Sequence, residues 1–201
     1  MLPKEFEFFI DALKSLPSIS SKSAKRIAYY FLGSDNLYYE TFLKRLIELK
    51  QKIKFCDACN NLTVDSNFCD ICNNTNRDQH KLCIVSYLED LEKIEHSNCY
   101  AGLYYVLNCE LSAKNFSNSN PINFAKLEQM INKFEIKEVL FCTNATANGE
   151  LTCLCVKNYL QEKKYQLDYY RIGLGIPINS EIEYIDYESL KHAINNKKKI
   201  I

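Results

Sequence analysis

Two cysteine pairs, Cys56-Asp-Ala-Cys59 and Cys69-Asp-Ile-Cys72, stand nine residues apart, and the rest of the sequence divides around them. Each pair can place two thiolates on one side of a tight turn, and two facing pairs make a closed tetrahedral cage of sulfur. The segment between the pairs is too short and too polar to form a core. Metal ligation would therefore supply most of its folding free energy, on the order of 10 kcal/mol. We predict one structural zinc ion bound by Cys56, Cys59, Cys69 and Cys72.

Two other interpretations fit the same four cysteines. An iron ion accepts the same four-sulfur geometry, and two disulfides would also use four thiols. The other six of the ten cysteines stand singly or in apolar runs, where a thiol behaves as a small hydrophobic group. This usage, with no targeting segment at the N-terminus, leads us to expect a reduced cytoplasmic compartment. Because a cage of four thiolates leaves no position for water, we expect a structural site.

The charge balance limits which partners the whole molecule can attract. The 201 residues carry 25 basic and 25 acidic side chains, so the formal net charge is zero. A neutral chain has no long-range attraction to nucleic acid, and any DNA contact must come from a local patch. Hydrophobic residues make up 47% of the sequence, as in globular proteins, and no apolar run reaches the length of a membrane span.

The segment before the cysteines, residues 1–54, has the pattern of three helices. Pro17 ends the first helix, and Ser20 or Ser21 can cap the second. In the second helix, Ile27, Ala28 and Phe31 are expected to form the buried face. The remaining apolar positions at helical spacing are Phe6, Phe9, Ile10, Leu13, Phe42, Leu43, Leu46, Ile47 and Ile53.

This helical segment is locally basic, with a net charge of +4. A tight turn over Pro17-Ser-Ile-Ser20 can direct backbone amides and the start of a helix toward a phosphate. We therefore predict a helix–hairpin–helix that contacts DNA through Ser20, Lys22, Lys25 and Arg26. The alternative is that these charges form only a solvated helical surface.

After residue 80, short apolar runs alternate with helical patterns. The four runs of strand length are 82–86, 102–107, 139–142 and 167–172. This alternation predicts an α/β domain with a mostly parallel sheet that is buried on both faces. Such sheets carry their functional loops at the carboxyl ends of the strands. Those ends are expected at Ser86 to Leu88, Asn108 to Glu110, Thr143 to Glu150 and Gly173 to Pro177.

A helix–hairpin–helix, a four-cysteine module and an α/β domain, in that order, resemble the bacterial RecR family of recombination mediators over essentially the whole chain. The order and spacing of several short motifs carry the resemblance. Besides the four cysteines they are Leu16-Pro17, Lys22-Ser-Ala-Lys-Arg26, Asn76-Arg-Asp78, Cys83-Ile-Val85, Ile94-Glu95, Gly102 to Leu107, Leu111-Ser112, Thr143-Asn-Ala-Thr146, Gly149-Glu150, Gly175-Ile-Pro177 and Glu183-Tyr184.

The resemblance implies four parts. A DNA-binding helix–hairpin–helix region would span residues 1–54, and a C4-type zinc finger residues 55–79. A Toprim domain would span residues 80–176, and a Walker-B-like, oligomerising C-terminal segment residues 177–201. The chains would assemble into a dimer or a ring-like tetramer that encircles or clamps DNA.

The resemblance also implies a function. The protein would bind single-stranded, gapped or duplex DNA without regard to sequence, in the cytoplasm and at the nucleoid. With RecO, and in some systems RecF, it would promote loading of RecA onto single-stranded DNA. Because acidic positions of the family's Toprim surface are associated with partner binding, Asn144 and Glu150 are the candidate partner contacts.

The sequence departs from the family pattern at positions that bear on function. Ser18 and Ser20 replace two hairpin glycines, a change that serine tolerates if φ stays negative. Ser86 replaces the glutamate that usually ends the first Toprim strand. Enzymes with Toprim domains need that glutamate and a later Asp-x-Asp pair to hold magnesium. Since Glu150 is the one carboxylate offered near the later strand, we expect no catalytic activity.

Two further segments differ from the family. The loop from Lys114 to Pro121 lacks a Gly-Ile-Gly-Pro run, and Asn179-Ser-Glu181 replaces Gly-Gly-Asp. No Gly-x4-Gly-Lys-Ser/Thr occurs, so ATP hydrolysis is not expected. Two alternatives remain open at this point. The chain could be a protein-binding adaptor without intrinsic DNA binding, or a degenerate Toprim enzyme that requires a divalent metal.

Overall fold

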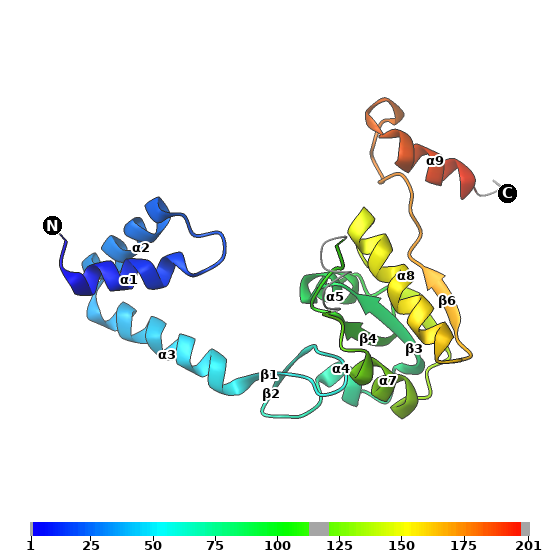
Figure 1. Cartoon of the computed structure of the whole chain (residues 1–201), viewed down its shortest axis with the longest axis horizontal. Helices are drawn as coiled ribbons and strands as arrows, with labels where there is room; N and C mark the ends of the chain where they lie inside the picture. Colours follow the sequence, from blue (N-terminus) through cyan, green and yellow to red (C-terminus); the bar gives the residue numbers. More distant parts are fainter. Residues whose placement is uncertain (1, 113–120, 198–201) are drawn as a thin grey trace. The chain divides into compact units, whose positions relative to one another are not determined.

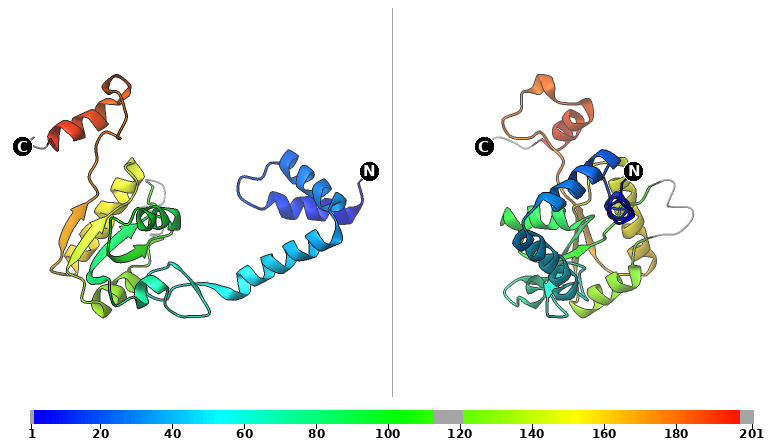
Figure 2. Two further views of the ribbon diagram at one scale, coloured as in Figure 1. Left: turned by 180° about the vertical axis from the view of Figure 1, so that it is seen from behind. Right: turned by 90° about the vertical axis from the view of Figure 1, so that its left-hand side faces the viewer.

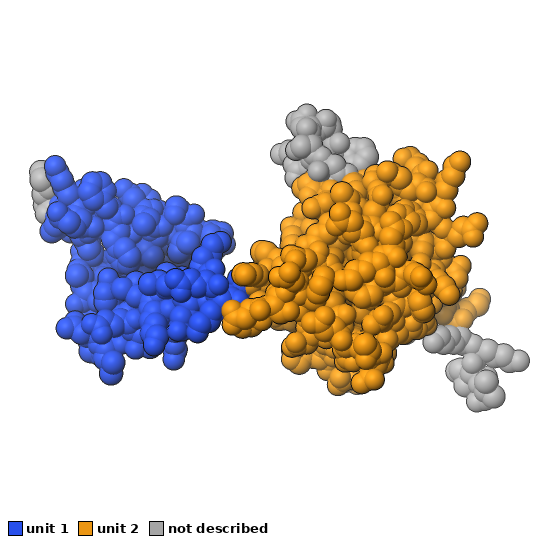
Figure 3. All heavy atoms as spheres, turned by 90° about the horizontal axis from the view of Figure 1, so that it is seen from below, with its two compact units in different colours: residues 1–53 blue, residues 54–201 orange. Residues whose placement is uncertain are grey.

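The structure is a computed structural model that describes residues 2–112 and 121–197. Two stretches discussed from the sequence lie largely outside the described residues. They are the loop from Lys114 to Pro121, of which only Pro121 is described, and the C-terminal residues Lys197 to Ile201, of which only Lys197 is described. The chain divides into two compact units, residues 1–53 and 54–201 (Figure 3). No helix in the described part of the chain combines the length and the apolar character needed to span a bilayer.

The first unit consists of three helices, as predicted (Figure 1). They are α1 (Lys4–Lys14), α2 (Ser21–Gly33) and α3 (Asn36–Lys52). Ser20 caps α2, because its Oγ accepts a hydrogen bond from the Ser23 amide at 3.2 Å. Asp35 caps α3 in the same way, with its carboxylate 2.8 Å from the Tyr38 amide.

The core of this unit is small. Ile10, Ala24 and Ala28 are buried between α1 and α2, whereas Ile27 and Phe31, which were expected on the buried face, are only half-buried. Helix α3 buries none of its residues. Large apolar side chains are therefore left exposed, among them Phe8, Tyr29, Tyr30, Leu32, Leu37, Leu46, Ile47 and Leu49. Exposure on this scale is typical of a surface that contacts another molecule.

The second unit begins with the four-cysteine module. Strands β1 (Ile53–Phe55) and β2 (Leu62–Val64) pair as a short two-stranded sheet, and α4 (Asp70–Asn73) is a single helical turn. This small sheet is not visible in the sequence, because three-residue strands are too short to show an alternating pattern.

The main sheet consists of β3 (Asp78–Val85), β4 (Gly102–Val106), β5 (Glu138–Phe141) and β6 (Asp168–Arg171). The strand order is β4-β3-β5-β6 and each neighbouring pair is parallel, which confirms the predicted parallel sheet. Three helices, α5 (Leu88–His96), α7 (Phe124–Lys133) and α8 (Ala147–Glu162), follow β3, β4 and β5 in turn (Figures 1 and 2).

Alternation along the strands divides the core between the two faces of the sheet. In β3, Cys83 and Val85 pack with Leu91 of α5, whereas Leu82 and Ile84 pack on the opposite face. That opposite face also holds the buried residues of α7 and α8 and all four paired cysteines. The four-cysteine module is therefore built into the core of the sheet domain.

An ion pair joins the entry of the sheet to α5. The two terminal nitrogens of Arg77, Nη1 and Nη2, donate to the Glu95 carboxylate at 2.6 and 2.9 Å, and Arg77 Nε donates to the Gly102 carbonyl at 2.9 Å. The hydrogen bond from Arg77 holds the pKa of Glu95 below its ordinary value. Two motifs that carried the resemblance, one at residues 76–78 and one at 94–95, thus meet in a single bidentate contact.

The chain ends in a 3-10 turn, Ile182–Tyr184, and helix α9 (Tyr187–Asn195), neither of which has a buried residue. Helix α8 begins at Ala147, within the stretch Thr143 to Glu150 that was expected to be a loop at a strand end. Thr146 caps it by accepting from the Gly149 amide at 3.1 Å, so Glu150 belongs to the first helical turn and not to the preceding loop.

Candidate functional site

The four paired cysteines form one cluster in which every sulfur is buried. Their ligand atoms all lie within 4.8 Å of one another, with Sγ–Sγ distances of 3.5 Å for Cys59–Cys69 and 3.9 Å for Cys56–Cys72. A tetrahedral site with metal–sulfur bonds of about 2.3 Å requires sulfurs about 3.8 Å apart. The cluster therefore has the size of a four-thiolate metal site.

The ionisation of each thiol in the cluster depends on that of its neighbours. Hydrogen bonds from Cys59, Cys69 and Cys72 lower the pKa of the Cys56 thiol. Hydrogen bonding to Cys56 raises the pKa of the Cys59 and Cys72 thiols. Four thiolates at these distances would repel one another, so all four thiols ionise together only when a cation neutralises their charge.

Neighbouring groups hold the first cysteine pair against the sheet domain. Lys126 of α7 donates to the Cys56 carbonyl at 2.8 Å and to Asn60 Oδ1 at 2.6 Å. Asn60 Nδ2 donates to the Val106 carbonyl at 2.7 Å, and the Val106 amide donates to the Cys59 carbonyl at 2.9 Å. These contacts link the ligand turn to both β4 and α7.

The hairpin of the first unit has an unusual backbone. Ser18 has φ 62°, which lies in the left-handed region that glycine adopts without strain. The expectation that serine would serve at a negative φ is therefore wrong for Ser18. It is right for Ser20, whose φ is −74°. The Ser20 hydroxyl is already engaged, since it caps α2 and lies 3.0 Å from Ser23 Oγ.

The three predicted basic contacts lie together on the first two turns of α2. Lys22, Lys25 and Arg26 are exposed, and within the described residues none of them has an acidic partner within ion-pair distance. Unpaired cations at the N-terminal end of a helix suit a phosphate, because the helix dipole adds to their charge.

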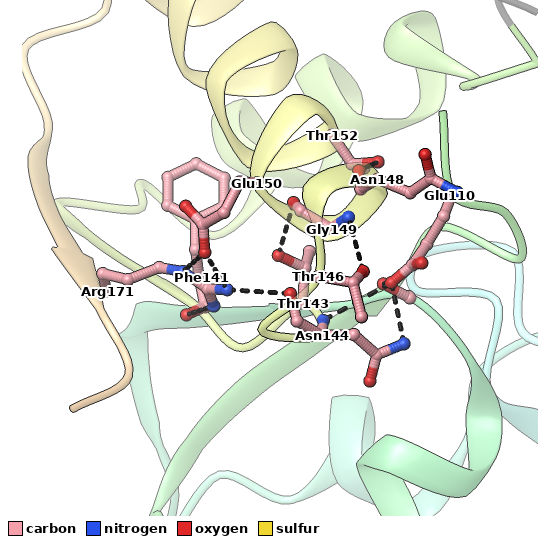
Figure 4. Close-up of polar contacts among 11 residues, drawn as sticks. Glu110, Phe141, Thr143, Asn144, Thr146, Asn148, Gly149, Glu150, Thr152 and Arg171 are labelled. Atoms are coloured by element: carbon pink, nitrogen blue, oxygen red, sulfur yellow. Dashed lines mark hydrogen bonds and ion pairs between the residues drawn. The ribbon is translucent and has the colours of Figure 1, made fainter. Parts of the chain in front are cut away.

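The carboxyl ends of β3 and β5 meet in a polar network around Glu110 (Figure 4). Ser86 is fully buried, and its Oγ donates to Glu110 Oε1 at 2.8 Å. Asn144, the predicted partner contact, is exposed and donates to the same oxygen from Nδ2 at 2.8 Å and from its amide at 3.4 Å. A carboxylate is therefore fixed beside the position where the family's glutamate is replaced.

Glu150 takes part in a second network (Figure 4). Arg171, at the end of β6, donates to Glu150 Oε1 from Nη2 at 2.6 Å and from Nε at 3.0 Å. The same guanidinium donates to the carbonyls of Phe141 and Asn144. An arginine thus neutralises the carboxylate that a divalent ion would need.

The loop between β5 and α8 depends on a close backbone contact. A Cβ atom on Gly149 would lie 2.0 Å from the Asn144 carbonyl oxygen, so only glycine fits there. Thr143 Oγ1 also donates to the Gly149 carbonyl, at 2.9 Å. This contact fixes the loop that carries Asn144 next to the helix that carries Glu150.

Glu110 and Arg171 were not among the site residues predicted from the sequence. Glu110 follows a predicted strand and Arg171 lies near the end of another, and this position at a strand end was the one sequence feature that could have marked them as site residues. Their partners are far away in the sequence: Ser86 follows β3, Asn144 follows β5 and Glu150 lies in the first turn of α8. The distance between such segments is not visible in the sequence. Of the predicted residues, the structure brings together the four cysteines, the three cations of α2, and Asn144 with Glu150 through Arg171.

Comparisons with known proteins agree with this architecture. A model of the Toprim domain matches residues 80–172, and a model described as the RecR helix-hairpin-helix matches residues 6–48. The recombination protein RecR of Ureaplasma urealyticum is 41% identical over 98% of both chains. The RecR proteins of Francisella philomiragia and Streptococcus suis are 35% and 34% identical, over 95% and 100% of this chain and 93% and 100% of their own. The chain therefore belongs to the RecR family of recombination proteins, which places it in DNA recombination and repair.

Proposed function

We propose that the protein is a DNA-binding recombination mediator without enzymatic activity. It acts with RecO, and in some systems with RecF, to promote RecA loading on single-stranded or gapped DNA in the cytoplasm, at the nucleoid. The observation that carries this proposal is the group of exposed cations Lys22, Lys25 and Arg26 at the start of α2, directly after the hairpin, which have no ion-pair partner within residues 2–112 and 121–197. Contacts of this kind bind phosphate and are independent of base sequence.

The direct test is a reconstituted loading assay. RecA filament formation is followed on single-stranded DNA that is coated with its binding protein, with and without this protein and RecO from the same organism. We expect RecA loading to be faster only when both proteins are present. If RecO alone gives the full rate, or if the pair has no effect, the mediator function is wrong.

We propose that the four-cysteine cluster holds one zinc ion. The burial of all four sulfurs and the spacing of their Sγ atoms support this assignment. When bound, the ion supplies folding free energy and no open coordination position for chemistry. Metal analysis of the purified protein should give about one zinc per chain.

The four-part division of the chain is also part of this proposal. Residues 1–54 contact DNA, the zinc finger of residues 55–79 is structural, and the Toprim domain of residues 80–176 presents Asn144 and Glu150 to a partner. The C-terminal segment, 177–201, contributes to assembly. The exposed apolar side chains of the first unit support assembly into a dimer or tetramer, because a second copy of the chain would cover them.

The Glu150–Arg171 pair argues against the alternative of a metal-dependent Toprim enzyme. A magnesium site needs several oxygen ligands around the ion, and here the candidate carboxylate is neutralised by a guanidinium at 2.6 Å. Incubation of the protein with labelled DNA and magnesium or manganese tests this alternative. Metal-dependent cleavage or synthesis of DNA that disappears in Glu150→Gln would show that the protein is an enzyme.

A further inference from the structure

The Toprim network contains an acidic residue that the family pattern does not place there. Ser86 directly follows β3, at the position where the resemblance leads one to expect a glutamate, and its buried hydroxyl donates to Glu110. Glu110 comes from the segment after β4, the strand adjacent to β3 in the sheet. The carboxylate that is missing from one strand end is thus supplied by its neighbour.

The Glu110 carboxylate is held in position through one of its two oxygens. Oε1 accepts from Ser86 Oγ at 2.8 Å and from Asn144 Nδ2 at 2.8 Å, with the Asn144 amide at 3.4 Å. No donor among the described residues lies within hydrogen-bond distance of Oε2, and the side chain is half-exposed. Three donors therefore orient a half-exposed carboxylate through its Oε1 atom.

We propose that Glu110 replaces the lost glutamate of the Toprim surface and accepts a lysine or arginine side chain of a protein partner. Ser86 and Asn144 are positioning residues, because each acts through the carboxylate that it orients. The inference rests on the proposed function, in which the Toprim surface contacts a partner protein.

The surroundings of Glu110 favour a basic side chain over other ligands. Ser86 and Asn144 direct donors at it, so they supply no further oxygen ligand of the kind that a hard cation requires. A phosphate of DNA would be repelled by the carboxylate. A lysine or arginine needs only one oriented carboxylate to form an ion pair, and an oriented one gives better geometry than a flexible one.

The test compares Glu110→Gln with wild type in binding RecO from the same organism. The glutamine amide oxygen can still accept from Ser86 and Asn144, so the fold is kept while the charge is lost. Glu162→Gln is the matched control, since Glu162 is exposed at the far end of α8. We expect Glu110→Gln to weaken RecO affinity about tenfold and Glu162→Gln to leave it unchanged. The difference from wild type should shrink as salt is raised, which a merely structural role would not produce.

A double substitution returns the carboxylate to the strand end. Ser86→Glu alone places two carboxylates in contact and should lower the unfolding temperature. Ser86→Glu combined with Glu110→Ser removes the repulsion, so both the unfolding temperature and RecO affinity should recover. RecO affinity that is equal for Glu110→Gln and wild type, or that fails to recover in the folded double variant, overturns the inference. If wild type does not bind RecO at all, the partner assignment of the proposed function fails and the inference fails with it.

Discussion

Ser18 shows how a single replaced residue changes the free energy of the hairpin. Most hairpins of this family have glycine there, and the structure explains why, since φ is 62° at this position. A residue with a Cβ atom pays about 1–2 kcal/mol in the left-handed region. Ser18 therefore adopts a backbone conformation that is strained for a residue with a Cβ atom.

Ser18→Gly should stabilise the first unit by about 1 kcal/mol, because glycine relieves the strain but adds entropy to the unfolded chain. Urea unfolding followed by circular dichroism measures the change. Ser20→Gly is the matched control, because Ser20 has a negative φ and caps α2, so this variant should be slightly destabilised. A loss of stability in Ser18→Gly would mean that φ is negative in solution.

Lys22→Ala combined with Arg26→Ala should weaken binding to all DNA sequences about equally, because the contacts are to phosphate. The slope of log affinity against log salt should fall by about 1 for each lost contact. Fluorescence anisotropy with a labelled single strand over a salt series measures both quantities.

The control for this pair removes two cations from the second unit. Lys93 and Lys137 are exposed and, among the described residues, have no ion-pair partner. Lys93→Ala with Lys137→Ala should change the affinity much less. If both double variants lose the same DNA affinity, the effect comes from net charge and not from the hairpin. If Lys22→Ala with Arg26→Ala leaves the DNA affinity unchanged, the assignment of the hairpin as the DNA contact is wrong.

At the scale of elements, side-chain contacts between segments far apart in the chain hold the sheet domain together. Arg77 and Glu95 join the entry of β3 to α5, and Lys126 joins α7 to the first cysteine pair. The cysteine cluster also shares its core with α7 and α8. Loss of the metal should therefore affect the sheet as well as the small module.

Glu95→Gln should lower the free energy of unfolding by about 1 kcal/mol near neutral pH, a modest value because solvent reaches the carboxylate. Arg77 holds the pKa of Glu95 below its ordinary value of 4.5. The contribution of the pair is therefore present above that value and is lost as the pH falls through the lowered pKa of the folded state. Denaturant unfolding at several pH values should show the difference between wild type and variant closing on acidification. A difference that does not depend on pH would exclude the ionic contribution.

Removal of the metal by a chelator, or Cys59→Ser, should unfold or aggregate the second unit. The binding free energy of a structural zinc, on the order of 10 kcal/mol, is comparable to the whole stability of a domain. Thermal unfolding and light scattering measure the effect, and added zinc should reverse chelation. Cys99→Ser is the control, because Cys99 is exposed and lies outside the cluster. A metal-free protein that stays folded without disulfides would contradict the structural role.

At the scale of the whole molecule, the first unit leaves more apolar surface exposed than a small monomeric domain usually does. Helix α3 buries no residue, and Leu46 and Ile47 are exposed at 54% and 55%. Assembly would cover this surface, and several copies of the basic helix would then act on one DNA molecule. Weak phosphate contacts gain strength in this way through multivalency.

The mass in solution should be a multiple of the 23.4 kDa chain, and Leu46→Ser with Ile47→Ser should lower it. Light scattering coupled to size exclusion gives the mass, with and without a short gapped duplex. Leu154→Ser is the comparison, because Leu154 is equally exposed but lies in the second unit. If wild type is a single chain with and without DNA, the proposed assembly is wrong.

Local patterns in the sequence were sufficient to predict the cysteine cluster, the parallel sheet and the helix boundaries near the hairpin. The spacing of the cysteines predicted the metal-site cluster, and the alternation of strands and helices predicted the parallel sheet, because both depend on residues that are close in the chain or on simple periodicity. The caps at Ser20 and the break at Pro17 were visible for the same reason.

Only the tertiary structure decided how residues from different strands combine. Glu110 meets Ser86 because β4 lies beside β3, and Arg171 meets Glu150 because β6 lies beside β5. The positive φ of Ser18 likewise follows from how the hairpin must turn to pack α1 against α2. Strand order and backbone geometry arise from packing of the whole core, which short-range patterns in a sequence do not record.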